Sequence, residues 1–190
     1  RANFLSSSIY SFYYSQELIK DSITDFVKQT LKKVVDNDYN LGEIFIPSFY
    51  LAYNLKDTNL LKSLLNKSII LADTISEIPV TAAQFYESIG ERDSSIALLK
   101  KYIKKFPDNQ RYYIQLGYSY FLENDWENAK NYLLEGYSMN TTNYNVLVSL
   151  GDVYDKLNKV DSAEYYYKLA LKMNSNDPLV NNNYAYFLSR

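Results

Sequence analysis

The chain has 190 residues, 47% of them hydrophobic and 22% charged, so it can bury a core and lacks the composition of a disordered protein. Its net charge of −2 gives no basic footprint for nucleic acid, and no apolar run is long enough for us to expect membrane insertion. Cysteine and histidine are both absent, which excludes disulfides, thiolate or imidazole metal ligands, and catalytic triads built on either residue. We therefore expect a non-enzymatic protein without metal or cofactor.

Residues 1–75 have helical periodicity but no repeated signature. Apolar residues at helical spacing predict a helical pair over residues 3–35 and a second hairpin over 47–71, which turns at residues 54–57. No linker rich in glycine, serine or proline separates these hairpins from the rest of the chain. We expect them to stack on the following helices as degenerate repeats of one continuous solenoid.

The polar stretch at residues 36–43 carries oxygen side chains at alternate positions, like the beginning of a calcium loop. An EF-hand needs glycine at the sixth position and glutamate at the twelfth. Leu41 and Pro47 stand there instead. The sequence therefore predicts a polar connector without a metal site.

From residue 76 onward the sequence repeats with a fixed period, which is the distance along the chain from Gly117 to Gly151. The same step leads forward to Ala185 and back to Ala83. It also separates three further small residues: Ser95, Ala129 and Ala163. Small residues with apolar neighbours three and four positions away predict helices that approach each other closely. The predicted units are residues 76–109, 110–143 and 144–177, with a half unit at 178–190.

This pattern resembles the tetratricopeptide repeat family. The family's W-x2-L-G-x2-Y, A-x3-F and A positions are matched in the second and third units by Tyr113, Leu116, Gly117, Tyr120, Ala129, Leu133, Leu147, Leu150, Gly151, Tyr154, Ala163, Tyr167 and Ala170. Departures are Tyr102 and Gly136 in place of alanine, Ser95 as the first small residue, and a family proline kept only as Pro107. The resemblance implies an all-α, right-handed solenoid of antiparallel helical hairpins with about eleven helices.

The hairpin turns and the closing segment follow from the same register. Turns are predicted at residues 123–125 and 157–159, and Asp125 is placed to cap the helix that follows it. The final residues, NNNYAYFLSR, are predicted to be the first helix of a fourth repeat. We expect the natural chain to continue into the second helix, as a piece of a longer bacterial-type protein. The alternative is that this helix caps the array with a polar outer face. An oligomer through the open C-terminal face is a further possibility.

The resemblance also implies a binding groove. In this family the first helix of each repeat lines the concave face, chiefly through its positions 2, 5, 6, 9 and 12. We expect the groove to contain Gln84, Glu87, Arg111, Gln115, Tyr118, Phe121, Asn145, Asp152, Asp155, Asn182 and Tyr186. Aromatic anchors with acidic neighbours are typical of a hot spot for a neutral-to-basic protein or peptide partner.

Chaperone-binding members hold a C-terminal carboxylate through lysine, asparagine and arginine at such positions. Here Gln84, Gln115, Asn145 and Ser149 stand there, so we do not expect a dicarboxylate clamp or a heat-shock chaperone as partner. Two other functions remain open. The chain could orient substrates for an attached enzyme, such as a glycosyltransferase, or serve as a structural element that stacks end to end.

Four lysines, Lys100, Lys101, Lys104 and Lys105, form a basic patch at helical spacing. We expect a solvated outer surface there, and the alternative is a site for an anionic partner. Asp152 and Asp155 lie one turn apart and could suggest acid/base chemistry. Lining of the groove is the expected role of this carboxylate pair.

Overall fold

The structure, a computed structural model, describes residues 21–36, 45–68 and 75–189. These residues form ten α-helices and their turns, with no β-strand among them, which confirms the all-α prediction. Most of the first predicted helical pair and the calcium-loop-like stretch lie outside the described residues. The chain divides into two compact units between Thr81 and Ala82, within helix α5. Each unit is described by itself, and the stacking of residues 1–75 on the array stays a prediction.

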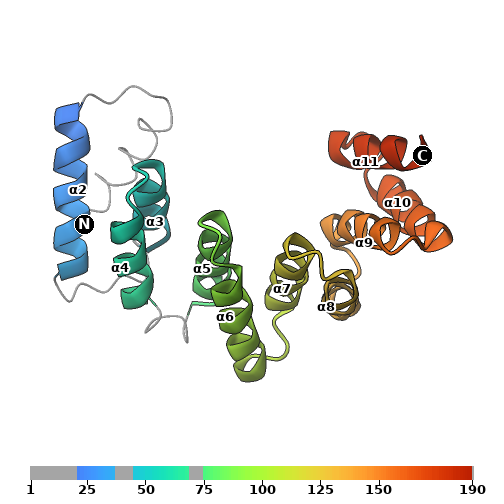
Figure 1. Cartoon of the computed structure of the whole chain (residues 1–190), viewed down its shortest axis with the longest axis horizontal. Coiled ribbons are helices and arrows are strands. Elements are labelled where there is room, and N and C mark those ends of the chain that lie inside the picture. Colours follow the sequence, from blue (N-terminus) through green and yellow to red (C-terminus); the bar gives the residue numbers. More distant parts are fainter. Residues whose placement is uncertain (1–20, 37–44, 69–74, 190) are drawn as a thin grey trace. The chain divides into compact units, whose positions relative to one another are not determined.

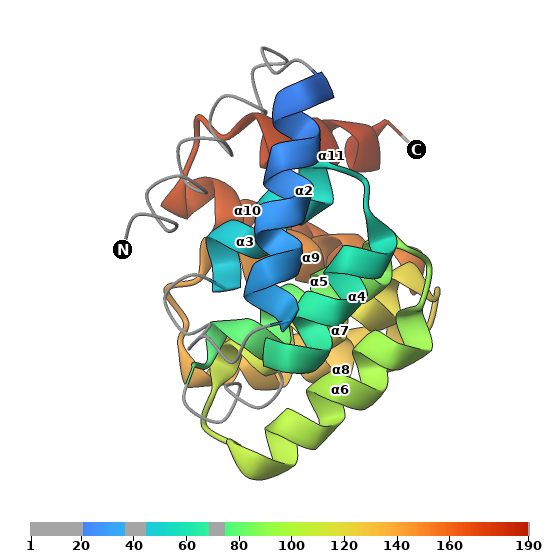
Figure 2. The ribbon, with the colours of Figure 1, turned by 90° about the vertical axis from the view of Figure 1, so that its left-hand side faces the viewer.

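The first unit contains α2 (Asp21–Asp36), α3 (Phe45–Asn54) and α4 (Thr58–Ser68), and α2 lies beside the hairpin of α3 and α4 (Figure 1, Figure 2). The hairpin turns where the sequence predicts. Asp57 caps α4 because its carboxylate accepts a hydrogen bond of 3.0 Å from the Leu60 amide. Leucines of α4 and apolar residues of α2 and α3 form the core of this unit: Val27, Leu31, Leu51, Ala52, Leu61, Leu64 and Leu65.

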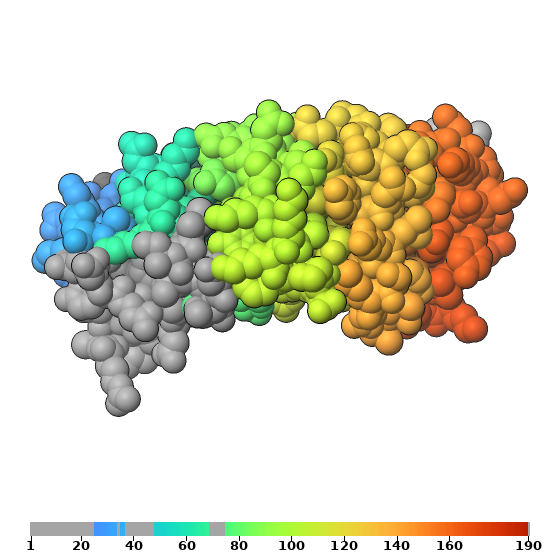
Figure 3. Space-filling model, turned by 90° about the horizontal axis from the view of Figure 1, so that it is seen from below, coloured from blue at the N-terminus to red at the C-terminus, as the bar shows by residue number. Residues whose placement is uncertain are grey.

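The second unit is a series of helical hairpins. It contains the part of α5 (Glu77–Ser88) that follows Thr81. Its other helices are α6 (Arg92–Lys105), α7 (Gln110–Leu122), α8 (Trp126–Met139), α9 (Tyr144–Lys156), α10 (Val160–Met173) and α11 (Pro178–Leu188). From α6 onward, each helix of this unit packs mainly against its neighbours in the chain. In the space-filling view the second unit accordingly forms successive bands in chain order (Figure 3). Such an arrangement is that of a solenoid, in which each repeat contacts the next.

Small residues are required where the two helices of a hairpin cross. A Cβ atom added to Gly117 would lie 2.7 Å from Leu133 Cγ, and one added to Gly151 would lie 2.6 Å from Tyr167 Cε1. Ala129 and Ala163 of the opposing helices are fully buried. Each hairpin needs small residues at its helix crossing, and this steric requirement explains why small residues recur with the period of the repeat.

The turns and caps of the second unit agree with the sequence prediction. The turns at residues 123–125 and 157–159 place Asn124 and Asn158 at φ angles of 61° and 56°. Asparagine adopts this left-handed region more readily than most residues. Asp125 caps α8 as predicted, because its carboxylate accepts a hydrogen bond of 3.2 Å from the Asn128 amide. Pro178 occupies the first turn of α11, where it breaks no helical hydrogen bond.

Candidate binding face of the second unit

The eleven residues predicted for the groove all lie on α5, α7, α9 and α11, the first helices of the successive repeats. We call the side of the second unit that carries them the first-helix face. Gln84, Tyr118, Asp152 and Tyr186 follow one another at intervals of one period, so they occupy equivalent positions on these four helices. The same backbone position therefore recurs on each first helix, and a different side chain occupies it in each repeat except that tyrosine occurs twice.

Around Glu87, at the step from α5 to α7, the face is occupied by an internal hydrogen-bond network. The Gln115 side-chain amide donates to both carboxylate oxygens of Glu87, at 3.1 and 2.9 Å. The hydroxyl groups of Ser95 and Ser119, both buried, also donate to Glu87. Gln84 donates to Gln115 at 3.2 Å. Three predicted partner-binding residues, Gln84, Glu87 and Gln115, thus join the helices of the unit to each other.

Asp152 has a similar internal role at the step from α9 to α11. It accepts a hydrogen bond of 2.6 Å from the Tyr167 hydroxyl and bonds of 3.1 Å from the Asn183 amide to both carboxylate oxygens. Burial raises the pKa of Asp152 above its usual range, and the charge of Asp155 acts in the same direction. The hydrogen bonds from Tyr167 and Asn183 oppose this rise in pKa without cancelling it.

The step between α7 and α9 carries aromatic side chains. Tyr118 and Phe121 stack with ring centroids 6.5 Å apart and an interplanar angle of 8°, and Phe121 meets Trp126 edge to face at 5.1 Å. Tyr118 is 46% exposed. A hollow of about 30 Å³ opens beside this pair, and we call it the α7–α9 hollow. Its lining residues are Tyr118, Phe121, Leu133, Ser149 and Asp152.

The hollow therefore brings together three of the predicted residues, Tyr118, Phe121 and Asp152. Arg111 and Asn145 are exposed on α7 and α9, and Asn182 and Tyr186 are exposed on α11, but none of them lines the hollow. Asp155 is half-buried on α9. The sequence prediction missed Leu133, although its position opposite Gly117 in the repeat indicates that it faces α7.

The exposed side of α11 carries apolar residues: Leu179, Tyr186 and Leu188. Such a surface is compatible with contact to another helix. Oligomer formation through this end stays a prediction.

The predicted basic patch on α6 is a solvent-exposed surface. Lys100, Lys101, Lys104 and Lys105 are all exposed. The ammonium group of Lys100 lies 5.3 Å from the centroid of the Tyr120 ring, and Lys101 and Lys105 lie 5.6 Å from the rings of Tyr102 and Phe106. Cations held over aromatic rings are thus a feature of this unit.

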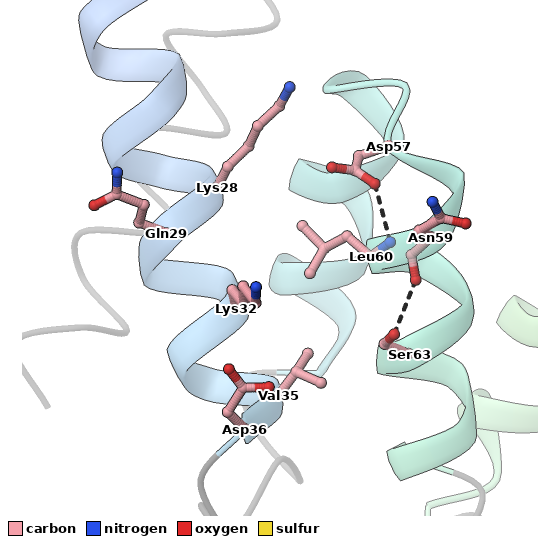
Figure 4. A pocket seen from close by; sticks show the side chains of 9 residues that line it. All are labelled: Lys28, Gln29, Lys32, Val35, Asp36, Asp57, Asn59, Leu60 and Ser63. Carbon is pink, nitrogen blue, oxygen red and sulfur yellow. Dashed lines mark hydrogen bonds between the residues drawn. The ribbon is translucent and has the colours of Figure 1, made fainter.

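A larger hollow, about 380 Å³, lies in the first unit between α2 and α4 (Figure 4). Its α2 wall carries Lys28 and Lys32, and its α4 wall carries Asn59 and Ser63, with Asp57 at the beginning of that helix. No repeated pattern in the sequence marks this cleft, and it is not among the predicted sites. Its walls carry both signs of charge, so its electrostatics favour no single class of ligand.

Within the described ranges, no cluster of three or more acidic residues could hold a metal ion. No described helix combines the length and the apolar character needed to cross a lipid bilayer.

Family models confirm the repeat pattern of the second unit. A model described as tetratricopeptide repeat matches residues 110–143 and 144–177, and a second model with the same description matches residues 81–109. Together they cover just over half of the chain. The chain belongs to the tetratricopeptide repeat family. Among curated protein sequences, no relative matches it.

Solved structures share the fold of this tetratricopeptide repeat protein at low sequence identity. One is the first TPR of Spaghetti (RPAP3) bound to the HSP90 peptide SRMEEVD, with 17% identity, a TM-score of 0.56, and coverage of 59% of this chain and 89% of that one. A crystal structure of MamA has 22% identity, a TM-score of 0.65, and coverage of 77% and 86%. MamA 41-end from Desulfovibrio magneticus RS-1 has 13% identity, a TM-score of 0.65, and coverage of 90% and 97%. These likenesses establish the fold of the chain.

Proposed function

We propose that the protein is a non-catalytic interaction module that binds a peptide or helical segment of a protein partner on the first-helix face. The observation that carries this proposal is the stacked pair of the exposed Tyr118 and the half-buried Phe121 beside the α7–α9 hollow. Aromatic residues at the centre of a polar surface contribute much of the free energy of protein association. The similar RPAP3 domain bound to a peptide is a precedent for this use of the fold.

The charge on this face favours a neutral-to-basic partner. Glu87, Asp152 and Asp155 place three carboxylates along the face. The peptide bound to the RPAP3 domain, SRMEEVD, is acidic towards its C-terminus. Gln84 and Gln115 are hydrogen-bonded to each other here, at two of the positions expected to hold clamp residues. The same surface would repel an acidic tail of that kind.

A pull-down tests the proposal. The bait proteins are the wild type, a Tyr118→Ala/Phe121→Ala double variant, and a Tyr165→Ala control. Tyr165 is also an exposed aromatic residue, but it lies on α10, a second helix of its repeat. We expect the wild type and the control to retain the same partners and the double variant, at unchanged thermal stability, to lose them. Equal retention by all three proteins would overturn the proposal and direct attention to the lysine surface of α6.

A further inference from the structure

The chemistry of the α7–α9 hollow restricts what can enter it. Its volume of about 30 Å³ is on the order of what one or two water molecules need, so it suits the end of a side chain. Two aromatic rings form one wall, and the buried Leu133 adds an apolar surface. Ser149 and Asp152 supply the polar part of the lining.

Both polar groups can accept further hydrogen bonds. The Ser149 hydroxyl donates to the Asn145 carbonyl oxygen at 3.2 Å, which leaves its own lone pairs for an incoming donor. Oδ2 of Asp152 receives only one branch of a shared bond from Asn183, at 3.1 Å, since the other branch and the Tyr167 hydroxyl go to Oδ1. A carboxylate oxygen can accept about two hydrogen bonds. The hollow therefore suits a compact donor with positive charge.

We infer that the α7–α9 hollow takes the ammonium group of a lysine side chain of the protein partner, with the lysine stem along the rings of Tyr118 and Phe121. This inference rests on the proposed function and names the group that anchors the partner. An ammonium group has three donors, no acceptor and a compact shape, whereas the guanidinium of arginine is planar and wider. A carboxylate group of the partner would be repelled by the negative charge of Asp152.

Two further observations support the inference. The unit already holds three of its own lysines over aromatic rings, at 5.3 to 5.6 Å from the ring centroids, so the same cation–π geometry fits its surface chemistry. Burial raises the pKa of Asp152, although the hydrogen bonds from Tyr167 and Asn183 and the charge of Lys156 act against this rise. A cation from the partner would favour the charged form further.

The test uses four pools of seven-residue peptides that share the same randomised uncharged flanks and differ in the central residue. That residue is lysine, arginine, glutamate or norleucine, the last being an uncharged straight-chain analogue of lysine. Acetylated and amidated ends remove the terminal charges. Binding is measured by fluorescence anisotropy at pH 7 for the wild type, Asp152→Asn, Ser149→Ala and the Tyr165→Ala control. Thermal melts accompany each variant, and Ser149→Ala is the milder substitution because its hydroxyl bonds only within α9.

We expect the wild type and the control to bind the lysine pool at least tenfold more tightly than the norleucine pool, and the arginine pool less tightly than the lysine pool. Both hollow variants should lose most of this preference, whereas the Tyr165→Ala control keeps it. Equal affinity for lysine and norleucine, a preference for arginine, or no binding to any pool would overturn the inference. Partners retained through Tyr118 and Phe121 in the pull-down would then leave the proposed function standing.

Discussion

Gly151→Ala is a sharp test of the helix crossing that generates the repeat. The added methyl group would lie 2.6 to 3.0 Å from three atoms of the Tyr167 ring, inside ordinary van der Waals contact. The ring has little room to retreat, because Tyr184 and Phe187 pack against it with centroids 5.6 and 5.5 Å away. Its hydroxyl is also fixed by the 2.6 Å hydrogen bond to Asp152. A shift of the ring therefore disturbs the contact between α10 and α11 as well as the hairpin itself.

The magnitude follows from two opposing terms. Replacing a helical glycine by alanine favours the helix by ~0.8–1.0 kcal/mol, whereas overpacking a filled core costs ~1–3 kcal/mol. We therefore expect Gly151→Ala to lower the free energy of unfolding by up to about 2 kcal/mol, and Gly151→Leu to lower it further.

Gly136→Ala is the matched control in the same unit. Its added methyl group would approach Ile114 Cγ1 at 3.0 Å and Tyr113 Cβ at 3.3 Å, a milder contact against a half-buried isoleucine that can adjust. This variant should be close to neutral, or more stable by up to ~1 kcal/mol through helix propensity. Urea unfolding followed by the fluorescence of Trp126, the single tryptophan, reports on the second unit. A Gly151→Ala protein as stable as the Gly136→Ala protein would refute the steric argument.

Two other predictions concern the polar and aromatic groups of the second unit. Glu87→Ala should lower the free energy of unfolding by ~1–3 kcal/mol, because the donors of Gln115, Ser95 and Ser119 lose their acceptor; Glu87→Gln, which keeps one acceptor oxygen, should cost less, and equal losses in urea unfolding would contradict this. Burial raises the pKa of Tyr166 to about 12, with the neighbouring Tyr154 adding to the effect, against about 10 in an unfolded chain. Because the folded-state pKa is the higher one, the stability linked to Tyr166 is fully present below pH ~10 and is lost as the pH rises from ~10 through 12. Tyr166→Phe should therefore lose less stability over that interval than the wild type, measured by alkaline unfolding and by absorbance at 295 nm, and identical pH profiles would count against it.

Much of the fold of the second unit could be predicted because its determinants are local. The steric need for Gly117 and Gly151 recurs once in every repeat, and the turn asparagines and the Asp125 cap act within a few residues of their own positions. Residues 1–75 lack such a recurring constraint. Their helices follow from apolar spacing, but the division of the chain between Thr81 and Ala82 depends on packing that no periodicity records.

The candidate site was predictable as a set of positions, whereas the roles of its residues were not. The sequence predicts Glu87 and Asp152 as carboxylates that line the groove and face a partner. The structure joins them to amides 28 and 31 residues further along the chain, Gln115 and Asn183. These two amides occupy equivalent positions two periods apart. In both cases a carboxylate of one repeat accepts hydrogen bonds from an amide at the sixth position of the next repeat. This pairing can be recognised in the sequence once the structure has shown one example of it.

The equivalent positions also explain why partner binding should concentrate at the step from α7 to α9. The solenoid keeps the backbone geometry constant, so the chemistry at each step depends on the side chain placed there. Near Gln84 and at Asp152 the side chains are engaged in hydrogen bonds that hold successive helices together. At Tyr118 the same position presents a half-exposed ring beside a hollow. Substitutions at Glu87 should therefore act mainly on stability, because its carboxylate is engaged in internal hydrogen bonds. Substitutions at Tyr118 should act mainly on binding, because its ring keeps exposed surface that a partner can cover.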